Sequence, residues 1–171
     1  MSSIDSLKRA RALALRLAVA LAFLAPLLTR LVMGQAYHQN GAGKIENFAR
    51  TVSFFSDLGI PMPEANAFFV SRLEYWGGLL LLLGLFTRVV AFMLSCQMVV
   101  ALLTADRGDF LDALKGTSEK GLTDVTSFVY LLFLIWLVLY GPGVVSLDAI
   151  GARWLDRKGG SPAAEKAPPP A

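Results

Sequence analysis

Four long apolar runs dominate the pattern of hydrophobic and polar positions along the chain. They extend over residues 13–33, 67–86, 89–105 and 125–140. Each approaches the roughly 17–25 residues that a helix needs to cross the hydrocarbon core of a bilayer. Because a spanning backbone must satisfy its own hydrogen bonds in lipid, helices are the structures that these runs predict. The pattern therefore predicts an all-α membrane protein, a four-helix antiparallel bundle.

The first run, residues 13–33, resembles a signal peptide because basic residues precede it. Its apolar stretch continues past Arg30, however, and no small-residue cleavage site follows its core. We interpret it as an uncleaved first membrane helix, with a cleaved signal sequence as the alternative. Proline disrupts the hydrogen bonding of a helix interior, so Pro26 is expected to kink this helix.

The segment between the first two runs is more polar and follows a helical period. Apolar residues recur there at steps of three and four, namely Ile45, Phe48, Val52, Phe55 and Leu58. Charged and polar residues occupy the opposite side of the same helix. This pattern is typical of an amphipathic interfacial helix, which lies at the membrane surface or caps a bundle. The Gly- and Pro-containing sequence 59–63 predicts that the helix stops there and the chain turns.

The amino-acid composition also indicates that the chain lies in a lipid bilayer. Of the 171 residues, 55% are hydrophobic and 17% charged, whereas roughly a quarter of an ordinary soluble domain is charged. A soluble globule of this size buries only about two-thirds of the surface that its unfolded chain exposes. It could not hide this much apolar surface from water, so the composition indicates a lipid environment.

We divide the chain into a basic N-terminus (1–12), a membrane domain (13–148) and a C-terminal segment (149–171). The Pro- and Ala-rich end of that segment is expected to be disordered from about residue 159.

The basic residues indicate an orientation. The net charge is +3, and Lys and Arg concentrate near both ends of the chain. With four spans, both termini lie on the same side as Arg88, which is in the loop between the second and third runs. The loop 106–124, in which acidic residues offset the basic ones, lies on the other side. The positive-inside rule then predicts a multi-pass protein with both termini cytoplasmic. Because no basic stripe with interleaved aromatic residues is present, we expect no nucleic acid partner; the expected partner is the lipid bilayer.

The chain contains one cysteine, Cys96, and one histidine, His38. A single thiol forms no internal disulfide, so a self-contained dithiol relay is excluded. A zinc site of the usual Cys/His type and bis-histidine haem ligation within one chain are excluded by the same count. No metal site is therefore expected, and redox chemistry at this protein would not use metals or thiols of its own.

Two stripes of residues at steps of three and four follow predicted helix faces. They are Arg30, Gly34, Tyr37, Gly41 and Lys44, and Glu74, Gly77, Leu81, Gly84 and Arg88. Small residues on such faces let membrane helices approach closely. Two interpretations stay open at this point. The stripes form either a closely packed seam with charges reaching toward the helix ends, or a polar pocket between the helices.

Glu74 favours the pocket, because an ionisable side chain about two turns inside a span is costly and usually faces a partner or a cavity. Its candidate partners are Lys44, Arg72, His38 and Arg30. Glu74 could form a salt bridge that locks the bundle, or it could accept a proton or bind a headgroup. The pocket candidates are Glu74, Arg30, Lys44, Arg88, Tyr37, His38, Trp76, Gly77 and Gly78, with Gly34, Gly77 and Gly78 leaving room between the first two helices. No catalytic residue is assigned.

Five motifs occur in an order that resembles the DoxX family of small bacterial membrane proteins. They are Phe55–Pro61, Glu74–Gly78, Leu82–Arg88, Met98–Ala101 and Gly141–Asp148. Arg30 and Lys44 fall where the family pattern has an arginine and a lysine in its first helix. Many members carry a histidine after the third span, where this chain reads Thr104–Arg107. The family pattern also has an acidic residue before the last span, and in this chain that position corresponds to either Glu119 or Asp124.

The resemblance implies a function that the residues alone do not. The family is similar to the DoxD subunit of archaeal thiosulfate:quinone oxidoreductase, and its members are commonly labelled oxidoreductases. It implies a bacterial inner-membrane subunit or accessory of a quinone-linked or thiol-redox system. Quinone is then the candidate cofactor, and soluble or membrane redox proteins are the candidate partners. The alternative is a non-enzymatic protein with a structural, chaperone-like or small-molecule permeation role.

Overall fold

The computed structural model describes residues 3–117 and 119–159, and within these residues the chain is mainly helical and forms no strand. The elements are α1 (Ser3–Leu21), α2 (Leu24–Glu46), α3 (Phe48–Asp57), α4 (Pro63–Leu83), α5 (Thr87–Leu103), α6 (Arg107–Lys115), the 3-10 helix η1 (Leu122–Asp124), α7 (Thr126–Tyr140) and α8 (Leu147–Gly159). The predicted all-α class is confirmed. The tail from residue 160 on, part of the segment predicted to be disordered, lies outside the described residues.

The first apolar run forms parts of two helices. α1 ends at Leu21 and α2 begins at Leu24, so the break lies close to Ala22, four residues before Pro26. This is where the ring of Pro26 would clash with a helical carbonyl group and where its missing N–H removes a hydrogen bond. α2 continues to Glu46, well beyond the predicted end at Met33. The predicted interfacial helix is therefore shorter than its pattern suggested, because Ile45 belongs to α2.

The other three runs correspond to α4, α5 and α7, with boundaries within a few residues of those predicted. α4 begins with Pro63 in its first turn, where proline has no hydrogen bond to lose. It ends at Leu83, before Gly84, whose φ of 68° is the left-handed conformation that glycine adopts without strain. α7 ends similarly before Gly141, whose φ is 89°. Glycine and proline thus set these helix boundaries.

Among the described helices, one apolar stretch is by itself long enough to cross a membrane. It extends over α1 and α2, from Leu7 to Glu46, and has 40 residues. α5 and α6 together would provide a second span if the two are counted as one, although the chain bends by 78° between them. α7 is apolar but shorter.

α2 and α4 pack closely along a seam of glycines. A Cβ atom added to Gly78 would lie 2.3 Å from the His38 backbone nitrogen and 2.6 Å from the Gly34 carbonyl oxygen. One added to Gly41 would lie 2.3 Å from the Tyr75 backbone nitrogen. Helix backbones approach this closely only where side chains are absent. The expectation that Gly34 and Gly78 leave room for a ligand is therefore wrong, because the opposite backbone fills that space.

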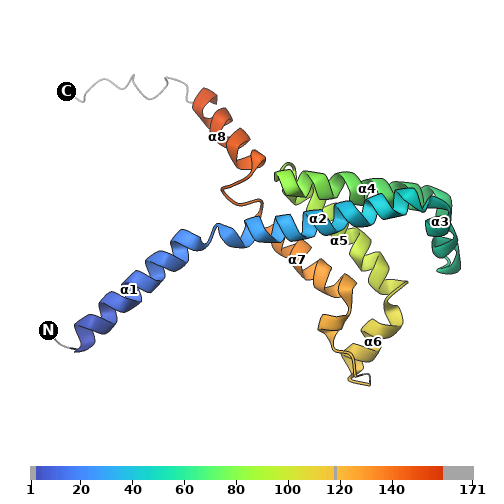
Figure 1. The fold of residues 1–171 in the computed structure, drawn as a ribbon, viewed down its shortest axis with the longest axis horizontal. Coiled ribbons are helices and arrows are strands. Elements are labelled where there is room, and N and C mark those ends of the chain that lie inside the picture. The colour runs from blue at the N-terminus through green and yellow to red at the C-terminus, as the bar shows by residue number, and fades with distance from the viewer. Residues whose placement is uncertain (1–2, 118, 160–171) are drawn as a thin grey trace, which may run out of the picture.

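Four of the described helices form two pairs, α2 with α4 and α5 with α7. The pairs share a core of buried side chains, namely Met33, Tyr37, Leu81, Val90, Ala91, Leu94, Met98, Leu134 and Leu137. α1 and α8 leave from one end of this core, and the two pairs diverge toward the other end, where α3 and α6 lie (Figure 1). A Cβ on Gly143 would lie 2.7 Å from Pro26 Cγ, so the chain leaving α7 contacts the start of α2.

Asp148, in the first turn of α8, connects the C-terminal segment to the turn between α4 and α5. Its carboxylate accepts hydrogen bonds from the backbone N–H groups of Phe86 (2.8 Å) and Thr87 (3.0 Å). Its own N–H donates to the Gly84 carbonyl oxygen at 3.0 Å. An acidic side chain at a helix N-terminus satisfies N–H groups that have no partner within the helix. Asp148 therefore caps α5 and holds the beginning of α8 at this end of the core.

Candidate functional site

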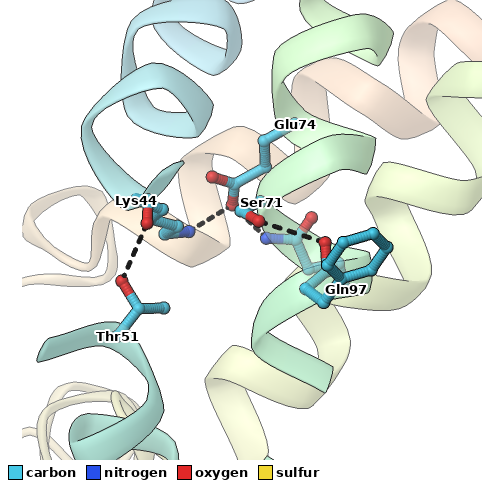
Figure 2. A network of polar contacts seen from close by, with 6 residues as sticks. Lys44, Thr51, Ser71, Glu74 and Gln97 are labelled. Carbon is cyan, nitrogen blue, oxygen red and sulfur yellow. Dashed lines mark hydrogen bonds and ion pairs between the residues drawn. The ribbon is translucent and has the colours of Figure 1, made fainter. Parts of the chain in front are cut away.

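A buried carboxylate, that of Glu74, lies where α2, α4 and α5 meet. The residue is 1% exposed. Lys44 Nζ lies 2.5 Å from Glu74 Oε1, and Gln97 Nε2 donates a hydrogen bond to the same oxygen. Figure 2 shows the three side chains converging from their separate helices. Of the four candidate partners of Glu74, the structure pairs it with Lys44, so the prediction that this carboxylate faces a partner is confirmed.

The local structure explains why Lys44 reaches Glu74. Lys44 lies in the last turn of α2, and Gly41, one turn earlier, brings the α2 backbone against that of α4 at Glu74 and Tyr75. Thr51 of α3 donates a hydrogen bond from its hydroxyl group to the Lys44 carbonyl oxygen at 3.4 Å (Figure 2). The glycine seam and the α2–α3 corner thus fix the lysine next to the carboxylate.

The other candidate partners of Glu74 are engaged elsewhere. Arg72 lies over the Phe68 ring, 4.2 Å from its centroid. His38 Nδ1 lies within hydrogen-bond distance, 3.0 Å, of the Tyr75 carbonyl oxygen. His38 therefore connects α2 to the α4 backbone, as an ordinary hydrogen-bonded histidine does, and it does not touch the carboxylate.

Three buried polar atoms near this cluster have no hydrogen-bond partner among the described residues. They are Glu74 Oε2, Gln97 Oε1 and the Tyr37 hydroxyl oxygen. Tyr37 is 1% exposed, and its ring packs edge-on against that of Tyr130, with centroids 5.6 Å apart. A buried polar atom without a partner is unfavourable by about 1–3 kcal/mol. The cluster is therefore incomplete as it stands.

A cavity of about 440 Å³ lies beside the cluster, where the two helix pairs diverge. Its polar residues include Tyr37, Lys44, Glu74 and Gln97 at one end and Thr104, Asp106, Thr126 and Ser127 toward α6. Apolar residues of α3, α4 and α5 line the space between these ends. A larger hollow of about 740 Å³ between α3 and α4 is more open and has one charged residue in its wall, Glu64. We take the cavity beside Glu74 as the candidate site, because it is next to the incomplete polar cluster.

The cavity opens between helices on the outer surface of the core. Several residues in its wall are also exposed outside, among them Phe54, Phe69, Met93 and Val100, the last by 50%. Cys96, the free cysteine, is exposed and lines the same wall. The wall of the cavity is thus formed partly by residues that are also exposed on the outer surface of the helices.

Arg30 and Arg88 do not belong to this site. Arg30 is 1% exposed, donates a hydrogen bond to the Val145 carbonyl oxygen and has Asp148 as its nearby countercharge. Arg88 Nη2 lies 3.5 Å from the Leu139 carbonyl oxygen. Arg30 and Lys44 are separated along α2 by about 21 Å at 1.5 Å per residue. The expectation of one polar pocket containing both arginines and Glu74 is wrong, because the charges form two clusters at different levels of the core.

The remaining pocket candidates lie outside the cavity. Trp76 is 57% exposed, on the outer side of α4. A Cβ added to Gly77 would lie 3.2 Å from Val90 Cγ1, so Gly77 faces α5. Gly78 lies in the α2–α4 seam. Of the nine candidates, Tyr37, Lys44 and Glu74 line the cavity.

Sequence reasoning missed Gln97, which completes the contacts of Glu74 Oε1. The available signal is that Gln97 is a lone amide inside an apolar run, and a buried amide in lipid requires a partner just as a carboxylate does. Within the described residues, no three His, Cys, Asp or Glu side chains are grouped so that they could hold a metal ion.

Comparison with known proteins places these features in a family. The DoxX profile matches residues 25–107, which include Glu74, Lys44 and Gln97. The chain is 30% identical over 125 residues to the Bacillus subtilis (strain 168) protein named "Putative oxidoreductase CatD", covering 71% of this chain and 83% of that protein. No solved structure matches the chain.

A second relative comes from Mycobacterium tuberculosis (strain ATCC 25618 / H37Rv). It is named "Uncharacterized membrane protein Rv3486" and is 39% identical over 101 residues, which cover 55% of this chain and 60% of that protein. Together, the profile match and the coverage of the Bacillus relative show that the chain belongs to the DoxX family of membrane proteins.

Proposed function

We propose that this protein is a multi-pass inner-membrane subunit or accessory of an oxidoreductase system, and that the cavity beside Glu74 holds the headgroup of a quinone-type lipid. The observation that carries the proposal is the position of the incomplete polar cluster at one end of a cavity whose lining is mostly apolar. Ligand pockets typically combine an apolar lining with a few placed polar groups that fix the orientation of the ligand. The relative named as an oxidoreductase supports a redox role.

The side opening supports a ligand that arrives from the lipid phase. Phe54, Phe69 and Val100 line the cavity and are about half exposed on the outer surface of the helices. In a bilayer such apolar positions face acyl chains. An amphiphile with a flat headgroup and an isoprenoid tail can enter there, with its tail remaining among lipids. The cavity volume of about 440 Å³ lies within the range of small-molecule sites.

The orientation proposed for the protein is that both termini are cytoplasmic. α1 and α8 leave the core at the same end (Figure 1), and both carry Arg residues. Positive charge accumulates on the cytoplasmic side of membrane proteins. Under this orientation the Arg30–Asp148 cluster lies near the cytoplasmic end and the α6 end of the cavity lies toward the outer side.

The test is purification of the full chain in a mild detergent, followed by solvent extraction and mass spectrometry of bound quinones and of co-purifying proteins. Ala101 lines the cavity, so Ala101→Phe should fill it and reduce the quinone retained per protein by at least about tenfold. Val99 is on the same helix but faces outward, 43% exposed, and does not line the cavity, so Val99→Phe is the matched control. Equal quinone in the two folded variants, or none in the parent protein, would contradict the proposal.

A further inference from the structure

The helix α1 leaves the core with its apolar side chains uncovered. Every residue from Leu7 to Phe23 is exposed, and α1 extends away from the other helices (Figure 1). Large apolar side chains are among these residues, with Leu7 72%, Leu17 54% and Leu21 55% exposed. A contiguous apolar surface of this kind marks a site that binds a protein or a membrane.

The length of the first helical stretch places α1 outside the hydrocarbon core of a bilayer. α1 and α2 together extend over 40 residues, from Leu7 to Glu46, which is about 60 Å at 1.5 Å per residue. The hydrocarbon core is only about 30 Å thick. α2 alone has 23 residues and extends over about 34 Å. Because α2 is the part that packs against α4, α2 is the span, and the break at Ala22 and Phe23 lies at the level of the lipid headgroups.

The basic residues of α1 are separated from its main apolar stripe. The stripe follows steps of three and four and consists of Leu7, Ala10, Ala14, Leu17 and Leu21. The basic residues lie outside it and are Lys8, Arg9, Arg11 and Arg16, against one acidic residue in the helix. Leu15 and Val19 lie among them, and residues 17–23 are apolar on every side. The helix is thus amphipathic in its basic part and fully apolar where it approaches the core.

Charge complementarity selects an anionic lipid surface as the occupant of this face. A helix with Lys and Arg on its polar side and Leu on the other lies in the plane of the membrane interface. The long basic side chains extend along the apolar surface and bring their charges to the phosphate groups. Such a surface is also adjacent to α1, because α2 enters the bilayer directly after the break.

We propose that α1 is an interfacial helix that binds the anionic phospholipids of the leaflet at its own end of the core. The break at residues 22–23 lets α1 turn from the axis of α2 onto the membrane surface. Leu7, Leu17 and Leu21 then lie among the acyl chains, and the basic residues lie at the phosphate groups. The proposal is independent of the cavity beside Glu74 and requires only that α2 spans the bilayer.

The experiment measures the depth of two positions of α1 in the full chain, reconstituted in phosphatidylcholine vesicles with or without phosphatidylglycerol. An environment-sensitive fluorophore is attached to Leu17→Cys, in the stripe, or to Ala12→Cys, on the opposite side. Both are made in a Cys96→Ser protein, because the natural cysteine is exposed. With phosphatidylglycerol, nitroxides on the acyl chains should quench the label at position 17, and aqueous acrylamide should quench the label at position 12. Without phosphatidylglycerol, the label at position 17 should become accessible to acrylamide.

A pair of charge variants tests the role of the basic residues. Each Lys or Arg near an anionic surface contributes a factor of about five, so Arg9→Gln with Arg16→Gln should lower the equilibrium constant for docking of α1 by about 25-fold. Raising the salt concentration should weaken docking in the parent protein, because salt screens these charges. Arg50→Gln with Arg107→Gln is the matched control. It removes two exposed positive charges from α3 and α6, at the other end of the core, and should leave docking unchanged.

Four results would overturn the proposal. Protection of both labels from both quenchers, whatever the lipid, would indicate that a protein or a second copy covers α1. Quenching of both labels by the acyl-chain nitroxides would place α1 inside the hydrocarbon, and quenching of both by acrylamide would place it in water. Equal loss of docking in the two pairs of arginine variants would show that the basic residues of α1 have no specific role. None of these results bears on quinone retention, so the two proposals fail separately.

Discussion

Lys44 and Glu74 are 30 residues apart in the chain and form an ion pair that joins the end of α2 to the middle of α4. The two side chains differ in their surroundings: the Lys44 side chain is 32% exposed and that of Glu74 is 2% exposed. The lysine can therefore reach solvent or headgroups when the pair opens, and the carboxylate cannot. This asymmetry determines what each substitution should do.

Lys44→Met should destabilise the protein, because it leaves the buried Glu74 carboxylate without its countercharge. Removing one partner of a fully buried pair is unfavourable by about 3–5 kcal/mol, and partial exposure of Lys44 reduces the value here. The melting temperature in detergent should fall clearly, and Lys44→Met combined with Glu74→Gln should recover part of the loss. Lys120→Met is the control, because the Lys120–Asp109 pair is exposed on both sides and should contribute less than about 1 kcal/mol. Equal shifts for the two lysines would contradict a buried pair.

The α2–α4 seam gives a second prediction. A Cβ on Gly78 would lie 2.3 Å from the His38 backbone nitrogen, so Gly78→Ala should push the helices apart and destabilise the protein by about 1–3 kcal/mol or more. Gly43, also in α2, has no atom within 4 Å of its added Cβ. Gly43→Ala should therefore be neutral or stabilise the helix by about 0.5–1 kcal/mol. Thermal unfolding of both variants checks the contrast, and a Gly78→Ala protein that melts like the parent would show that the seam is loose.

Much of the helical framework could be predicted from the sequence, because apolar runs and their Gly and Pro boundaries act locally. α4, α5 and α7 were located in this way. The contact of Glu74 with a basic residue could also be predicted, since an isolated carboxylate in an apolar span requires a partner. α8 could not be predicted in this way, because the sequence from residue 149 on indicated only a C-terminal segment. Its anchoring by Asp148 depends on a long-range contact with residues 86 and 87.

The composition of the site was less predictable. A stripe such as Arg30 to Lys44 indicates which residues share a helix face, but it does not indicate what lies opposite each of them. Arg30 faces the chain near Val145, while Lys44 faces Glu74. Glycines are equally consistent with an open pocket and with a close seam. The α2–α4 and α5–α7 pairs diverge (Figure 1), and residues of both pairs line the cavity, so the cavity is a property of long-range packing.

Asp148 provides a third prediction. Asp148→Ala removes the cap of α5 and the countercharge of Arg30. Loss of a capping side chain is unfavourable by about 0.5–2 kcal/mol, and the beginning of α8 should separate from the core. Limited proteolysis should then cut between residues 141 and 148 faster than in the parent protein. Asp156→Ala, in the exposed part of α8, should change neither stability nor cleavage, and faster cleavage in both variants would contradict an anchoring role.

The last prediction concerns the proposed orientation. Arg88 lies at the beginning of α5 and Asp109 in α6, after the 17 residues of α5, which extend over about 25 Å at 1.5 Å per residue. If α5 crosses the bilayer, reporters inserted after Arg88 and after Asp109 should be on opposite sides, with Arg88 cytoplasmic because the basic ends of the chain lie at the same end of the core. Paired alkaline phosphatase and green fluorescent protein fusions measure this directly. A fusion after residue 171 should match Arg88. Identical signals at Arg88 and Asp109 would mean that α5 and α6 enter and leave the membrane on one side, as the 78° bend between them would allow.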